Sequence, residues 1–109
     1  MTKYEKKKLD SLWQKLITVG KCSYPGCNKT GSEGHHIFKR RFYNTRWKVE
    51  NGRALCRTHH DWAETHPVIY EALIIGEIGL EAYGVLRLES LTLKKQYYNE
   101  ILEYLKGRL

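Results

Sequence analysis

The 109-residue sequence predicts a single α+β domain, residues 1–109, with no linker long enough to divide it. Three observations support this prediction. Residues 3–19 have the apolar spacing of an amphipathic helix. Two short segments, 35–38 and 53–55, are candidate strands on either side of an irregular basic loop. Helical patterns then fill most of the remaining chain, so helices are expected to flank a small strand pair.

Each element has a local sequence signal. The first helix would bury Leu9, Leu12, Trp13, Leu16 and Ile17, and Gly20 would end it. Residues 21–34 form a turn-rich loop. A helix over 57–65 ends before Pro67, since the residue before a proline avoids helical geometry. The helix that begins at Val68 is expected to break at Gly76 and Gly79. Further helices are predicted over 81–88 and 93–107, the last burying Tyr98, Ile101, Leu102 and Leu105.

Basic residues are concentrated in the middle of the chain. The net charge is +7, and residues 21–60 hold nine Lys or Arg against two acids, so this segment carries the whole excess. Such a surface suits a polyanion such as nucleic acid. The alternative is a basic face that is only solvated.

The composition also excludes some classes of protein. No apolar run approaches the roughly 20 residues that span a bilayer, so no membrane partner is expected. The first six residues lack the apolar core of a signal peptide, which predicts an intracellular, cytoplasmic protein. Three cysteines without a signal peptide fit a metal site better than a disulfide framework.

The cysteines have the spacing of zinc ligands. Four residues separate Cys22 from Cys27, and two separate Cys56 from His59. Three thiolates and an imidazole form an accepted tetrahedral zinc set, so we expect a structural Zn²⁺ that staples this small domain. The alternative is three unligated cysteines at ligand spacing. A two-Cys, two-His finger is excluded by spacing, and a nucleobase deaminase by the lack of a His-x-Glu box.

A second set of residues remains: the pair His35-His36, Asn51 and His60, with fourteen residues between His36 and Asn51 and eight between Asn51 and His60. The stretch GHHIFKRR…TRWKVENGRALCRTHH resembles the motif of HNH endonucleases with their zinc knuckles. Arg40-Arg41 followed by Thr45-Arg46-Trp47 resembles small phage-encoded nucleases of this family. The resemblance covers about residues 22–67, and the helical segments 3–19 and 68–109 flank it.

The resemblance implies a ββα-metal (His-Me finger) core of two strands and a helix around a catalytic divalent metal. It implies that His35 and His60 ligate this metal, which would be Mg²⁺ or another ion such as Mn²⁺ or Ni²⁺. It implies that His36 is the general base and that Asn51 holds the His36 ring through the local backbone. Histidine at position 59 departs from the commoner Cys-x-x-Cys-His ending, which leaves open which of His59 and His60 faces which metal.

Spacing adds further candidates. Glu64 lies one helical turn after His60 and is a possible third ligand, or else a surface acid. Trp47 either packs the basic loop onto the core or contacts DNA. Phosphate contacts, which position DNA without reading its sequence, are expected from Lys39, Arg40, Arg41, Arg46 and Lys48.

Together these features predict a metal-dependent endonuclease on double-stranded or branched DNA. A histidine that titrates near neutrality can deprotonate water, and a divalent ion can stabilise the phosphate and leaving oxygen. The alternatives are a non-catalytic zinc-stapled nucleic-acid-binding module and a toxin-like or RNA-directed nuclease.

Overall fold

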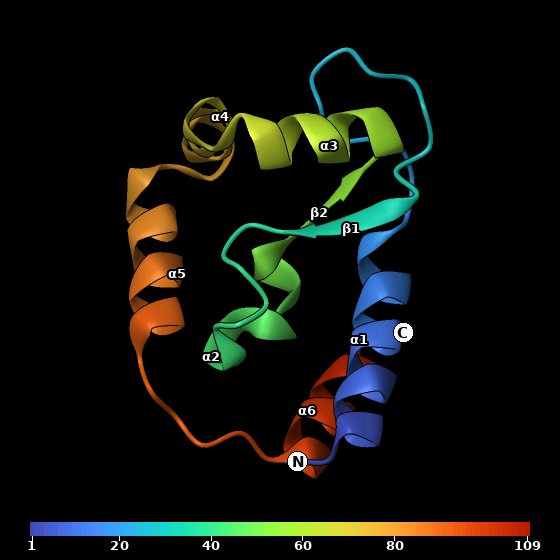
Figure 1. Ribbon diagram of the computed structural model, residues 1–109, viewed down its shortest axis with the longest axis vertical. Coiled ribbons are helices and arrows are strands. Elements are labelled where there is room, and N and C mark those ends of the chain that lie inside the picture. Colours follow the sequence, from blue (N-terminus) through green and yellow to red (C-terminus); the bar gives the residue numbers. More distant parts are fainter.

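A computed structural model describes residues 1–109 as an α+β fold with six α-helices and one two-stranded antiparallel sheet (Figure 1). A 3-10 helix, η1, precedes the second strand. The elements, in order, are α1 (Lys3–Ile17), β1 (Glu33–His36), α2 (Tyr43–Arg46), η1 (Val49–Asn51), β2 (Gly52–Leu55), α3 (Arg57–Thr65), α4 (Pro67–Ile78), α5 (Leu80–Leu91) and α6 (Tyr98–Lys106). None of the helices is both long enough and apolar enough to cross a membrane.

The sheet lies between α1 on one face and α3 on the other. Its register pairs Glu33 with Leu55 and His36 with Gly52. A Cβ atom on Gly52 would lie 2.5 Å from the Ile17 side chain, so a residue without a side chain allows α1 to approach β2 closely. Because neighbouring residues of a strand point to opposite faces, Glu33 faces α3 whereas His36 faces α1.

Two hydrophobic clusters hold these layers together. One joins the end of the sheet to α3, α4 and α5, and it contains Cys22, Leu55, Cys56, Ala63, Tyr70, Ile74 and Tyr83. The other joins the first helix to the last, with Leu9, Trp13, Trp47 and Leu105 at its centre. Figure 1 shows α1 and α6 side by side although they lie at opposite ends of the sequence. Trp47 is buried in this second cluster, which confirms that it packs the basic loop onto the core.

The structure confirms most predicted elements and corrects several boundaries. The helix predicted over 57–65 is present with those limits. The first strand lies two residues earlier than predicted, at 33–36, and the last helix begins at Tyr98 rather than at residue 93. The predicted break at Gly76 is wrong, because Gly76 lies inside α4. A single glycine costs a helix about 1 kcal/mol, which the burial of neighbouring α4 residues offsets. The break falls at Gly79, which has a φ of 90°.

A charged residue is buried where the basic loop meets α1. Arg46 is 6% exposed, and its Nε and Nη2 atoms donate to the Asp10 carboxylate at 3.0 and 2.7 Å. The Trp47 indole donates to the same carboxylate at 2.8 Å. Asp10 therefore neutralises a buried guanidinium and anchors the loop, and the expected phosphate contact of Arg46 is not supported.

We expect Asp10→Ala to lower the free energy of unfolding by about 3 kcal/mol, because it leaves the Arg46 charge buried without a partner. Urea unfolding monitored by circular dichroism measures the loss. Asp61→Ala, which removes a carboxylate that is 60% exposed, is the matched control and should change stability little. Equal midpoints for Asp10→Ala and the parent would contradict a structural role for this pair.

Candidate metal centres

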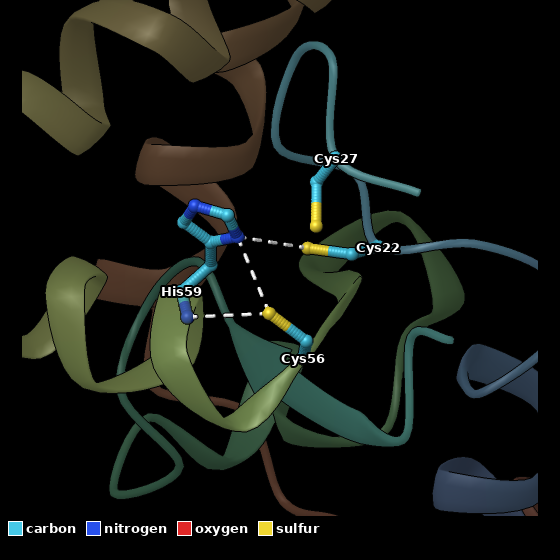
Figure 2. A group of neighbouring side chains, drawn as sticks. All are labelled: Cys22, Cys27, Cys56 and His59. Carbon is cyan, nitrogen blue, oxygen red and sulfur yellow. Dashed lines mark hydrogen bonds between the residues drawn. The ribbon is translucent and has the colours of Figure 1, made fainter. Parts of the chain in front are cut away.

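Three cysteines and one histidine converge at the end of the sheet. Cys22 and Cys27 come from the loop after α1, where Gly26 at a φ of 80° allows the chain to turn between them. Cys56 follows β2 directly and is the N-terminal cap of α3, and His59 lies in the first turn of that helix. Figure 2 shows the three sulfur atoms gathered around one edge of the His59 ring. The structure therefore brings together all four residues of the predicted structural zinc set.

The distances in this group fit tetrahedral ligands around one ion. The Nδ1 atom of His59 lies 3.4 Å from the Cys22 sulfur and 3.2 Å from the Cys56 sulfur. Zn–S and Zn–N bonds of about 2.3 and 2.0 Å at a tetrahedral angle would separate the two ligand atoms by about 3.5 Å. All three cysteines are free thiols rather than disulfide partners.

Surrounding groups contact the side chains of this group. The Tyr24 ring stacks on the His59 ring with centroids 3.9 Å apart. The backbone N–H of His59 points at the Cys56 sulfur and lowers the pKa of that thiol, which favours the thiolate form that binds metals. Burial raises the pKa of Cys22 instead. A cation would therefore have to favour the thiolate of Cys22 against desolvation.

A second group of ligand atoms lies on the face of the sheet next to α3. His35, His60 and Glu64 place one ligand atom each within 4.8 Å of the others. The Oε1 atom of Glu64 lies 3.0 Å from His35 Nε2 and 3.7 Å from His60 Nε2. His59 and His60 are consecutive in α3, and the helix turns them about 100° apart. The two histidines therefore point into different groups, His59 toward the cysteines and His60 toward His35 and Glu64.

The charge state of this second group suits a cation. Burial lowers the pKa of His35 although the Glu64 carboxylate opposes it, so the ring favours its neutral, ligating form. A hydrogen bond from Lys39 to Glu64 Oε2 lowers the pKa of Glu64 and leaves Oε1 facing the histidines. Two residues that the sequence did not single out, Glu33 and Tyr70, contact the imidazoles from outside the group.

His36 lies on the other face of the strand pair and is not part of this ligand group. Its ring stacks on Trp13 with centroids 4.0 Å apart, and its Nε2 lies 3.0 Å from the backbone oxygen of Arg46. Burial lowers the pKa of His36 to about 4. The free-imidazole value near 6.5 therefore does not apply, and the ring is neutral at neutral pH. His35 and His36 both line a cavity of about 180 Å³.

Asn51 is fully buried and ties the basic loop to the strand end. Its Oδ1 accepts from the Phe38 N–H at 2.8 Å. Its Nδ2 donates to the carbonyls of Phe38 and Thr45 at 3.0 and 3.1 Å. Thr45 precedes Arg46, whose carbonyl is the partner of His36. Asn51 thus fixes the backbone that holds the His36 ring, which is the arrangement that the resemblance implies.

The predicted DNA-contacting residues differ in their surroundings. Lys39, Arg40 and Arg41 are exposed, although Lys39 bonds to Glu64 and Arg40 lies 3.8 Å from Asp10. Lys48 is half-buried and pairs with Glu89. Three side chains of the expected set are therefore on the surface, whereas Arg46 is buried.

Comparisons of the chain with protein-family models, with curated proteins and with solved structures find no match. The geometry of the two ligand groups and of His36 is therefore the basis on which a function can be argued.

We expect Asn51→Ala to lower the free energy of unfolding by about 3 kcal/mol, because it leaves buried backbone groups of the loop without partners. Amide hydrogen exchange should also show faster exchange at Phe38, which loses its acceptor. Asn99→Ala on the exposed side of α6 is the matched control. Unchanged protection of the Phe38 amide would show that Asn51 does not hold the loop.

Proposed function

We propose that this protein is a metal-dependent endonuclease that hydrolyses phosphodiester bonds of DNA. The observation that carries the proposal is the combination of three elements, each of which contributes at least one residue to the lining of one small cavity. These are a cation-ligand group, a neutral histidine held by the backbone, and exposed basic side chains. Under this proposal, β1, β2 and α3 form a ββα-metal core.

The cysteine group would hold a structural zinc ion. Its four ligands come from the loop after α1, the end of β2 and the start of α3, so one ion would tie three segments together. A domain of about 100 residues has a small core, and such a staple adds stability that burial alone supplies poorly. The four ligands leave no position open for substrate, so catalysis would take place at the other group, formed by His35, His60 and Glu64.

His35, His60 and Glu64 would hold the second, exchangeable cation. The two imidazoles suit a borderline ion such as Ni²⁺ and the carboxylate suits a harder ion such as Mn²⁺, whereas Mg²⁺ is usually bound by oxygen ligands alone. Three protein ligands leave positions for phosphate oxygen and water. A divalent cation bound there supplies a Lewis acid that stabilises charge on the phosphate and on the leaving oxygen.

His36 would accept the proton of the attacking water. A backbone carbonyl only accepts hydrogen bonds, so the His36 Nε2 next to the Arg46 oxygen carries the ring proton. The lone pair then resides on Nδ1. Because burial holds the pKa of His36 at about 4, this lone pair is free at neutral pH. The low pKa also makes His36 a weak base, so its contribution depends on position as much as on basicity.

Lys39, Arg40 and Arg41 would contact DNA phosphates. They follow His36 closely in the chain and extend from the loop that Asn51 fixes, so bound phosphates would be brought near the cavity. Such contacts are not specific for sequence. One site of this kind acts on one strand, and a monomer would therefore nick a duplex.

We expect the purified protein to contain one tightly bound zinc ion, and Cys22→Ser to lose both the zinc and cooperative unfolding. Removing one thiolate weakens metal binding, and metal binding at such a site contributes directly to folding. Elemental analysis and thermal unfolding measure these effects. Ser23→Ala changes the neighbouring position without touching the ligand set and should keep the zinc. A folded parent that contains no zinc would disprove the assignment.

The nuclease is tested by incubating the protein with supercoiled plasmid and Mg²⁺, Mn²⁺ or Ni²⁺, with and without EDTA. The parent should nick the plasmid only with divalent metal. His36→Ala should cut about 10²–10⁴-fold more slowly, the usual contribution of a positioned general base. His36→Gln keeps an N–H donor for the Arg46 carbonyl, and it should be equally slow if the missing base is the cause.

His66→Ala is the matched control for histidine loss, because His66 is exposed and outside both ligand groups. Its rate should equal that of the parent. Zinc content, circular dichroism and binding to a DNA duplex should be nearly unchanged in all three variants. Cleavage by His36→Ala at the parental rate would exclude the general-base role. A parent that binds DNA but cuts nothing with any metal would instead be a zinc-stapled nucleic-acid-binding module.

A further inference from the structure

The two imidazoles of the second ligand group, those of His35 and His60, differ in the residue that contacts Nδ1, the ring nitrogen that faces away from Glu64. The Nδ1 atom of His60 lies 2.6 Å from Glu33 Oε1. An ionised carboxylate only accepts hydrogen bonds, so His60 Nδ1 carries the proton. In the neutral ring the lone pair must then be on Nε2, which is the nitrogen that faces Glu64. Glu33 thus selects the form of His60 that can bind a cation.

The partner of His35 makes no such selection. The hydroxyl of Tyr70 lies 3.3 Å from His35 Nδ1, and a hydroxyl can donate or accept a hydrogen bond. His35 Nε2 lies 3.0 Å from the Glu64 carboxylate, which accepts a hydrogen bond from the N–H of that nitrogen when no cation is present. His35 must therefore move its ring proton to become a ligand, whereas His60 already has its lone pair in place.

The strand and helix hold Glu33 in position for this contact. Glu33 begins β1, pairs with Leu55 of β2 and faces α3. Its Oε1 atom also accepts a hydrogen bond from Arg57 Nη1 at 3.4 Å, and this arginine side chain is 73% exposed. The contact to His60 is shorter and less exposed, so the Arg57 pair is the weaker of the two interactions.

We propose that Glu33 is a positioning residue that sets the ring orientation and tautomer of His60 for binding a divalent cation. The proposal rests on the cation site proposed above, formed by His35, His60 and Glu64. Carboxylates that hold ligating histidines in this way typically contribute 10- to 100-fold in metal affinity. Glu33 occupies the equivalent position here, because its carboxylate contacts His60 Nδ1 whereas His60 Nε2 faces the proposed cation site.

The first measurement is Mn²⁺ affinity, followed by the electron paramagnetic resonance of free Mn²⁺, in protein with zinc in the cysteine site. Glu33→Ala should weaken Mn²⁺ binding about 10- to 100-fold. Glu33→Gln retains an oxygen acceptor for His60 Nδ1 and should recover part of the affinity. Arg57→Ala removes the ion pair but leaves Glu33, and it should bind Mn²⁺ within about twofold of the parent.

The second measurement is a long-range ¹H–¹⁵N spectrum of the imidazoles without Mn²⁺, which reports the protonated nitrogen of His60. The parent should show the proton on Nδ1, and Glu33→Ala should shift population to the other tautomer. A merely structural role for Glu33 would not move this signal. The parental spectrum remains decisive even if Glu33→Ala fails to fold.

The outcomes separate this inference from the proposed nuclease. Glu33-dependent Mn²⁺ binding in a protein that cuts no DNA would support the inference and overturn the nuclease. Metal-dependent cleavage with equal Mn²⁺ affinity in the parent and Glu33→Ala would overturn the inference alone. A parent that binds no Mn²⁺, or that holds His60 with its proton on Nε2, would also overturn it.

Discussion

The pairing of β1 with β2 is the constraint on which both ligand groups depend. Their register places His35 beside α3 and His36 beside α1, since adjacent residues of a strand point to opposite faces. The strand β2 leads directly into Cys56 and α3, so the helix begins at a fixed position over the sheet. Two consecutive histidines of that helix then reach different groups. The strand pair and the start of α3 thus place four histidines in three environments. His59 lies with the cysteines, His35 and His60 lie with Glu64, and His36 lies against Trp13.

Local sequence signals predicted what depends on local structure. The helix over 57–65 and the convergence of Cys22, Cys27, Cys56 and His59 follow from helix-ending residues and ligand spacing, and the structure has both. Glu64 was an open choice between ligand and surface acid, because spacing gives its helix face but not what lies opposite. The structure places it against the histidines.

The features that the sequence did not predict depend on distant partners. The sequence predicted Arg46 to be a surface cation, because its partner Asp10 lies 36 residues away in the chain, in α1. Glu33 counted only as one acid in a basic segment, because its contact with His60 requires the sheet register. The low pKa of His36 arises from burial against Trp13, which no motif specifies. In each case a tertiary contact changes the chemistry of a residue whose type was already known.

The two proposed ions would be coupled through α3. His59 points toward the cysteines and His60 toward Glu64, and both lie in the first turn of the same nine-residue helix. A helix this short has little stability of its own, so its position depends on packing and on its first turn. An ion in the cysteine group would fix that turn, and with it the position of the His60 backbone. Glu33 would then set the orientation and tautomer of a ring whose backbone is already in place, and stability and catalysis would share one local structure.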